Sequence, residues 1–170
     1  RDFTELSRND NDYIYTIMEK SDDINNEIHF NLSLDAKLNV ITLSGTDSGG
    51  NITGATSNIL EFTAGEWHHI AITYDSDPTA GKRTTFYFDG MKEGSSDSFV
   101  LSEKGANGSL YLGKSAANDG DYFFGTLDEI RVWGETLDSG TLEAYRNKSL
   151  LGGEEDFARR EGLDLRGYWQ

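Results

Sequence analysis

The sequence has 170 residues, the length of one ordinary domain, and 36% of them are hydrophobic, including nine Phe, eight Tyr and three Trp. A chain of this size and composition can bury a sizeable core. The formal net charge of −15 argues against nucleic-acid binding, which needs a basic surface, and fits either high solubility or cation binding.

Other features of the composition narrow the class of protein further. The chain has no cysteine, so it forms no disulfide and carries out no thiol chemistry. No apolar run is long enough to cross a bilayer, and we expect no membrane insertion. One Pro and 19 Gly indicate many strands and tight turns rather than disorder.

The first third of the chain contains strand patterns separated by polar loops. The best alternation runs from Ile28 to Leu34, with apolar side chains on one face and polar ones on the other. Shorter strands are expected at Tyr13–Met18 and Leu38–Leu43. We expect the acidic stretch Glu19–Asn26 and the Gly- and Ser-rich stretch Ser44–Ser57 to be mostly loop.

The centre of the chain predicts a β-hairpin. Trp67–Tyr74 is dense in apolar and β-branched residues, and Thr84–Asp89 alternates with Phe86 and Phe88 on one face. A polar, turn-rich link joins the two segments, and Asp89-Gly90 suits a tight turn after the second strand.

Two more strands are expected later in the chain, at Ser109–Gly113 and Thr126–Trp133, on either side of the acidic loop Ala116–Asp121. In the second of these strands, Asp128 shares a face with Ile130, so its side chain is expected to point toward the core.

A single helix is expected near the C-terminus. Asp138 suits the N-cap of a helix from about Ser139 to Lys148, which Leu142 and Tyr145 would attach to the sheets.

Three of these motifs resemble the laminin-G-like and pentraxin-like jelly rolls of the concanavalin A-like lectin/glucanase superfamily. The motifs are Trp67–Asp75 followed by Phe86–Gly90, then Ser109–Gly113 followed by Phe124–Trp133, and finally Leu137-Asp138 before a short helix and Tyr145. The resemblance implies an all-β, two-sheet antiparallel jelly-roll sandwich of the concanavalin A-like type with one short C-terminal helix. Residues 1–170 would then form a single laminin-G-like module, which we expect to come from a larger multi-module protein with neighbouring modules in the same chain.

The two acidic loops predict a calcium site, because calcium takes several carboxylate, amide and carbonyl oxygens as ligands. The candidate ligands are Asp22 and Asp23 in the first loop, and Asn118, Asp119 and Asp121 in the second. The resemblance to pentraxins implies that these two loops meet at one rim of the sandwich. The alternative is that both loops are solvated turns, where Asp, Asn and Gly are favoured in any case.

Asp128 is a separate candidate for a metal ligand. The laminin-G-like resemblance implies that an Asp at this point of the motif helps to hold a structural calcium ion. The alternatives are hydrogen bonds from nearby backbone N–H groups or an ion pair with Arg131.

The sequence predicts no catalytic residue. Glycanases of this architecture carry a Glu-x-Asp-x-x-Glu pattern on one strand, and the chain contains no such spacing. His68 and His69 are adjacent, so they should point to opposite faces of a strand, and no His-Glu-x-x-His zinc pattern occurs.

Recognition of a sugar needs exposed aromatic rings, and Tyr122 and Phe123 after the second acidic loop are the candidate platform. The alternative is that Phe123 and Phe124 anchor the loop in the core, which is the expectation for Phe124.

We therefore predict a non-catalytic module, extracellular or at the cell surface, that recognises a glycan or an extracellular protein through its rim loops. Calcium is the only cofactor that the sequence suggests. The rival hypotheses are a structural spacer without a ligand of its own and an accessory module of a glycanase.

Overall fold

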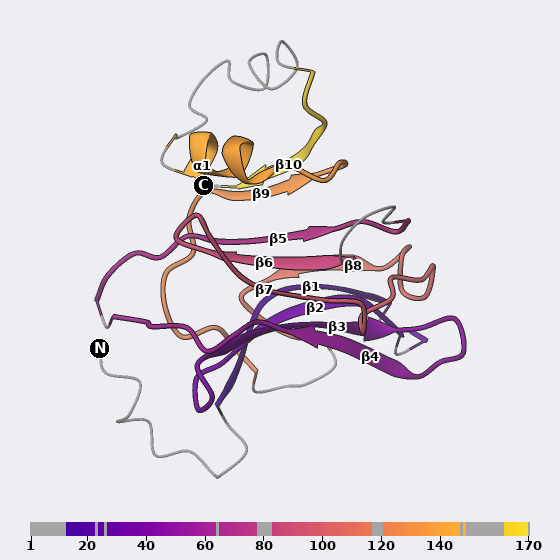
Figure 1. Ribbon diagram of the computed structural model, residues 1–170. Coiled ribbons are helices and arrows are strands. Elements are labelled where there is room, and N and C mark those ends of the chain that lie inside the picture. The colour runs from indigo at the N-terminus through magenta and orange to yellow at the C-terminus, as the bar shows by residue number, and fades with distance from the viewer. Residues whose placement is uncertain are drawn as a thin grey trace.

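The chain folds into antiparallel strands and one short helix (Figure 1). The computed structural model describes residues 13–22, 24–25, 27–63, 65–77, 83–116, 121–146, 148 and 162–169. One sheet has five strands: β1 (Ile14–Asp22), β2 (Glu27–Asp35), β3 (Val40–Thr46), β4 (Ile52–Thr56) and β8 (Ser109–Leu112). The other elements are β5 (Ile70–Tyr74), β6 (Thr84–Phe88), β7 (Met91–Ser96), β9 (Ile130–Trp133), α1 (Ser139–Arg146) and β10 (Leu165–Trp169).

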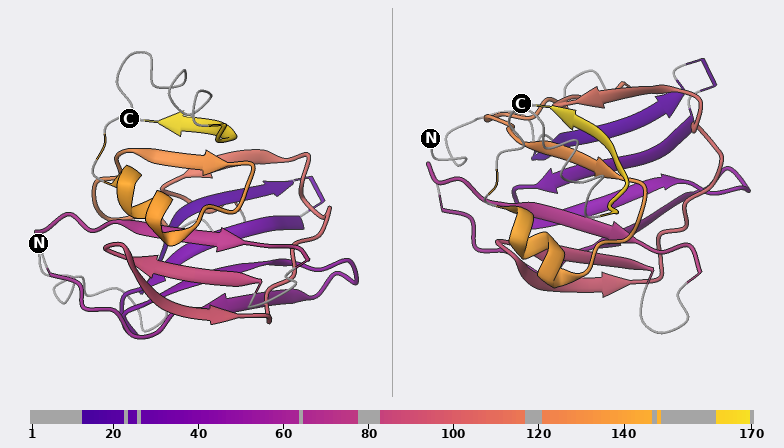
Figure 2. Two further views of the ribbon diagram at one scale, coloured as in Figure 1. Left: turned by 45° about the horizontal axis from the view of Figure 1, so that its top comes forward. Right: turned by 90° about the horizontal axis from the view of Figure 1, so that it is seen from above.

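The strands form two layers. The first layer is the five-stranded sheet in the order β4-β3-β2-β1-β8, and the second consists of the sheet β5-β6-β7 and the pair β10-β9. Figure 1 and both views in Figure 2 show β9 beside β5, on the side away from β6. The expected antiparallel sandwich with one short helix is confirmed, with its second layer divided into two hydrogen-bonded sheets.

The core lies between the two layers. Both layers contribute to it, because Phe86 on β6 packs with side chains of β1 to β4. The buried members of this cluster are Tyr15, Ile17, Leu34, Ile41, Leu43, Ala55, Leu60, Phe86 and Phe99. At about 25 cal/mol for each Å² of apolar surface removed from water, this burial is the main force that holds the layers together.

The central hairpin has the predicted form. β5 and β6 pair in the register Ile70↔Phe88 and Ile72↔Phe86, which places these apolar side chains against the core. Asp89 and Gly90 both have positive φ angles, of 48° and 83°, and positive φ at both central residues is the requirement of a type I′ turn.

Three strands differ from the sequence-based expectation: β1 and β4 in the first layer and β7 in the second. β1 continues through Glu19–Asp22, which was expected to be loop, and β4 lies within the stretch expected to be loop. β7 was not predicted at all. β4 and β7 are rich in Gly, Ser and Thr, so their strand conformation comes from pairing with β3 and β6 and not from a hydrophobic pattern of their own.

Helix α1 begins as predicted. Asp138 accepts hydrogen bonds from the Thr141 amide at 2.9 Å and from the Thr141 hydroxyl at 3.1 Å, which is N-cap geometry. Leu142 and Tyr145 are buried as expected, and the Tyr145 ring meets Trp133 of β9 edge to face. The helix ends at Arg146, two residues before the expected end.

Candidate functional site

The connection between β8 and β9 spans residues 113–129, of which 113–116 and 121–129 are described. Gly113 has a φ angle of 71° and donates its amide to Ile17 O at 2.9 Å, so the chain turns sharply at the end of β8. Phe123 then donates its amide to Gly113 O at 2.9 Å, and Tyr122 forms a parallel bridge with Thr16 on β1. These bonds place residues 121–123 next to the end of β8.

A buried carboxylate lies under this connection. Glu19 of β1 is completely buried. Its Oε1 accepts from Ser21 Oγ and from the Ala116 amide, both at 2.9 Å, and its Oε2 accepts from Asn31 Nδ2 at 2.7 Å and Ser115 Oγ at 2.8 Å. Four donors offset the cost of removing a carboxylate from water. The sequence pattern did not reveal this buried position, because Glu19 stands at the start of an acidic run that is typical of a loop.

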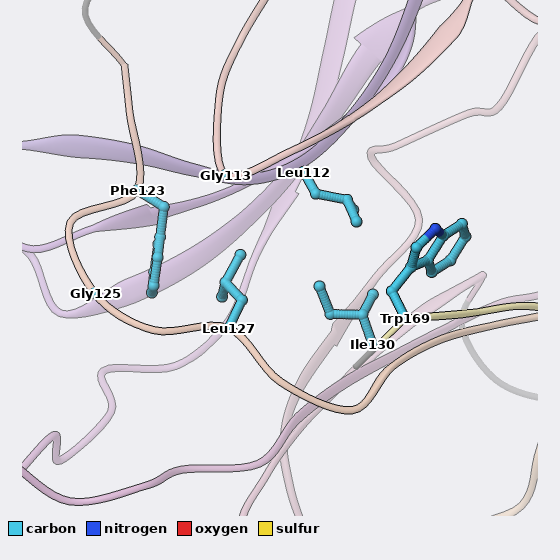
Figure 3. Close-up of a pocket in the computed structure, with 7 residues that line it drawn as sticks. All are labelled: Leu112, Gly113, Phe123, Gly125, Leu127, Ile130 and Trp169. Carbon is cyan, nitrogen blue, oxygen red and sulfur yellow. The ribbon is translucent and has the colours of Figure 1, made fainter. Parts of the chain in front are cut away.

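A groove opens between the layers at the side of the sandwich formed by β8, β9 and β10, and we call it the edge groove. It has a volume of about 390 Å³. Its lining residues are Leu112, Gly113, Phe123, Gly125, Leu127, Ile130 and Trp169. Figure 3 shows Leu112, Leu127 and Ile130 between Phe123 at one end and Trp169 at the other. No lining residue is ionisable, so the edge groove offers apolar contact and ring stacking rather than acid–base chemistry.

Glycines allow two of the aromatic rings to lie close to the backbone. A Cβ at position 125 would come within 2.8 Å of the Phe123 ring, and a Cβ at position 167 would overlap the Trp169 indole. The two rings are therefore held against the chain at opposite ends of the edge groove, which limits the entropy that each would lose on binding.

Exposed aromatic side chains occur on two segments that contribute to the groove lining. Tyr122 is 52% exposed, Phe124 43% and Trp169 38%. Phe123 instead packs against the core, and the expectation that Phe124 anchors the loop in the core is wrong. Phe124 rather than Phe123 therefore accompanies Tyr122 at the surface.

The described residues of the two acidic loops, Asp22 and Asp121, lie far apart. Asp121 O accepts from the Thr16 amide at 3.2 Å, whereas Asp22 lies six positions further along β1, a distance of about 20 Å. Asp22 is satisfied locally, because its side chain accepts from Ile24 N at 3.0 Å and from Asn25 Nδ2 at 2.7 Å. These bonds, with the Asn25 side chain first, lower the pKa of the Asp22 carboxyl.

The other predicted ligands, Asp23, Asn118 and Asp119, lie outside the described residues. Within the part of the chain that the structure describes, no three His, Cys, Asp or Glu side chains gather in a way that could hold a metal ion.

The expected inward orientation of Asp128 is wrong. Its side chain is exposed, and its Oδ1 accepts from the Glu129 amide at 2.9 Å. Glu129 has a φ angle of 54°, which breaks the strand alternation, and β9 begins only at Ile130. Glu129 instead carries the buried contacts, accepting from Arg131 Nη2 at 2.8 Å and from the Tyr168 hydroxyl of β10 at 2.7 Å.

The two adjacent histidines lie on opposite faces, as predicted. His68 stacks on Phe88 with ring centroids 4.9 Å apart, and its Nε2 accepts from Thr63 N at 3.1 Å. Its Nδ1 therefore carries the proton and donates to Asp89 Oδ2 at 2.8 Å. Burial raises the pKa of Asp89, but hydrogen bonds from His68 and from the His69 amide outweigh burial and leave it below the ordinary value.

His69 lies near Arg131 of β9 and Arg146 of α1. Burial lowers its pKa, and the nearby charges of Arg131 and Arg146 lower it further, while Asp89 and Glu143 oppose this effect. His69 Nδ1 is buried and accepts or donates no hydrogen bond within the described residues. Neither His68 nor His69 lines the edge groove.

Comparison with known proteins places this arrangement in a family. A laminin G family model, described as the concanavalin A-like lectin/glucanases superfamily, matches residues 5–143. The chain belongs to this superfamily. No curated protein and no solved structure matches the chain.

The match to the concanavalin A-like superfamily includes β1 to β9 and the whole 113–129 connection. β10 and Trp169 lie beyond it, so one wall of the edge groove comes from outside the matched residues. Laminin-G-like domains are generally non-catalytic and typically extracellular, and the superfamily fits a module that binds carbohydrate or protein. Among the described residues, no helix is long and apolar enough to cross a membrane.

Proposed function

We propose that this laminin-G-like module recognises a glycan at the edge groove, without catalysis, as part of an extracellular or cell-surface protein. One observation carries the proposal: an apolar groove without ionisable side chains includes the exposed ring of Trp169 in its lining, and the exposed rings of Tyr122 and Phe124 belong to the segment whose Phe123 and Gly125 also line it. Pyranose rings present apolar C–H faces that stack on aromatic rings, while backbone and hydroxyl groups at the margin can bond the sugar hydroxyls.

A protein ligand is the second candidate, because both strands beside the groove are sheet edges. In the described part of the chain, β8 pairs only with β1 and β10 only with β9. An extended peptide could add to such an edge through backbone hydrogen bonds and place an apolar side chain in the groove.

A glycan array tests the proposal. We expect the wild-type module to bind a restricted set of glycans, and the variants Trp169→Ala and Tyr122→Ala/Phe124→Ala to lose most of this signal. Trp67→Ala is the matched control, because Trp67 is 67% exposed and is not a lining residue of the edge groove. Binding that survives the groove variants but not Trp67→Ala would place recognition elsewhere.

An array without any bound glycan would remove the glycan proposal. Selection of extended peptides by the wild-type module, again lost in Trp169→Ala, would then favour the protein ligand. Binding of neither glycans nor peptides would favour the rival hypothesis that the module is a structural spacer without a ligand of its own.

A further inference from the structure

The base of the 113–129 connection is separated from the edge groove by the thickness of one sheet. Glu19 is paired with Asn31 of β2 and with Tyr111 of β8, so it shares a cross-strand row with them. The neighbours Met18 and Leu112 belong to the next row, and Leu112 lines the groove. Because alternate rows of a sheet point to opposite faces, Glu19 lies on the outer face and the groove on the inner one.

The carboxylate joins three separate segments of the chain. Ser21 belongs to the same strand, Asn31 to β2, and Ser115 and Ala116 to the connection. In the described part of the chain, no ion pair involves Glu19. Hydrogen-bond donors alone therefore satisfy the buried carboxylate.

The hydrogen bonds to Glu19 fix the position of Ser115 and Ala116 in the connection. The Ala116 amide and the Asn31 side-chain NH₂ can only donate, so each needs an acceptor at its place, and both oxygens of Glu19 supply one. A buried network of this kind specifies one arrangement, because any displacement leaves a donor unsatisfied.

The position of the connection affects the groove through Gly113. Gly113 lies two residues before Ser115, accepts the Phe123 amide, and is itself a lining residue together with Phe123. Leu127 approaches the same glycine, with its methyl group 3.8 Å from the Cβ position. Holding Ser115 and Ala116 on the outer face therefore fixes the wall that Phe123 and Leu127 form on the inner face.

We propose that Glu19 is the positioning residue of the recognition site: its buried carboxylate holds Ser115 and Ala116 against the outer face of the sheet and so sets the shape of the edge groove. This inference rests on the proposed function for its biological meaning, but the positioning itself can be measured without a ligand.

The test is Glu19→Gln, which keeps the size of the side chain and replaces one acceptor oxygen by a donating NH₂ group. We expect amide hydrogen exchange at Ala116 and Phe123 to accelerate at least about tenfold, since a lost hydrogen bond to a charged group is worth about 1.5–3 kcal/mol. We also expect the methyl resonances of Leu127 to shift. Exchange in β2 and β3 should stay near the wild-type rate.

Ser115→Ala removes one donor and leaves the carboxylate in place, so it gives a milder form of the same pattern if Glu19→Gln does not fold. Glu27→Gln is the matched control, because Glu27 is a partly buried carboxylate on β2 that pairs with Lys104 at 2.5 Å. It should change neither the two amides nor Leu127.

Unchanged exchange at Ala116 and Phe123 in Glu19→Gln would overturn the inference. Equal acceleration in β2 and β3 would also overturn it, because Glu19 would then serve global stability only. A failed glycan array would remove the proposed function but leave these readouts valid, so the two failures are distinguishable.

Discussion

The indole of Trp169 lies over Gly167 in the same strand, so closely that a Cβ at position 167 would overlap the ring. This pair explains why a large side chain at the margin of the edge groove is only 38% exposed. The ring is held in place before any ligand arrives, and its position depends on a residue without a side chain.

Gly167→Ala should therefore displace the Trp169 ring and weaken ligand binding about as much as loss of the ring itself. An aromatic stacking contact of about 1.5 kcal/mol corresponds to roughly a tenfold change in affinity. Tryptophan fluorescence should report the displacement as a shift of the emission maximum. Gly54→Ala is the matched control, because a Cβ at position 54 meets nothing closer than 3.4 Å. Unchanged emission and affinity in Gly167→Ala would contradict the preorganised ring.

Arg131 connects helix α1 to the second layer. Its Nη1 donates to Tyr145 O at 2.6 Å, and its Nη2 donates to Lys148 O and to Glu129. Arg131→Ala leaves a partly buried carboxylate and two carbonyls at the end of the helix without their donor, so we expect a loss of about 3 kcal/mol in the free energy of unfolding. For a domain of this size that lowers the thermal midpoint by roughly 6–12 °C.

Arg166→Ala is the control for that experiment. Arg166 is exposed and pairs with Asp164 at 2.7 Å, and surface pairs contribute at most about 1 kcal/mol. Equal midpoints for the two variants would show that Arg131 does not stabilise the helix contact.

His69 predicts a pH dependence of stability. Its pKa is lowered in the folded protein, first by burial and then by Arg131 and Arg146, so the unfolded chain binds the proton more readily than the native state. The free energy of unfolding should therefore fall as the pH drops below about 6.5, the ordinary histidine value. His69→Phe cannot gain this charge, and its thermal midpoint should change less than that of the wild type between pH 7 and pH 5.

His29→Gln serves as the comparison, because His29 lies in the other layer and contacts Lys104 O. Its thermal midpoints at pH 7 and pH 5 show whether the loss of a histidine elsewhere in the sandwich gives the same result. A dependence that is unchanged in His69→Phe would assign the effect to other groups.

Calcium assistance remains a proposal, and the thermal midpoint in calcium and in excess chelator tests it. An ion that binds only the native state stabilises it by about 2.7 kcal/mol at a hundred times its Kd, so we expect a higher midpoint in calcium. Since Asp22 and Asp121 lie at different ends of β1, the variants Asp22→Asn and Asp121→Asn test the two loops separately. Equal thermal midpoints in calcium and in excess chelator would show that the native module binds no calcium.

The hydrophobic pattern carried most of the information on the fold. The alternation from Ile28 to Leu34 and the paired aromatic residues of the central hairpin each mark one face of a strand, and β2, β5 and β6 formed where expected. β4 and β7 could not be predicted in the same way, because their strand conformation depends on neighbours that a linear pattern does not reveal.

The candidate site was less predictable than the fold. Tyr122 was identified correctly as exposed, but the positive φ of Glu129 turned Asp128 outward, and local sequence gave no sign of that break. Glu19 stood in an acidic run that resembled a loop, and its burial depends on Ser115, 96 residues away. Contacts at such separations are set by topology, which the sequence of either segment alone does not encode.

The most direct test of recognition at the edge groove is a methyl NMR titration of the module with the glycan that binds most strongly on the array. Recognition at the edge groove should shift the methyl resonances of Leu112, Leu127 and Ile130 on saturation, while those of the exposed residues Leu38 and Ile59 stay unchanged. Shifts at Leu38 or Ile59 with an unchanged groove would contradict it.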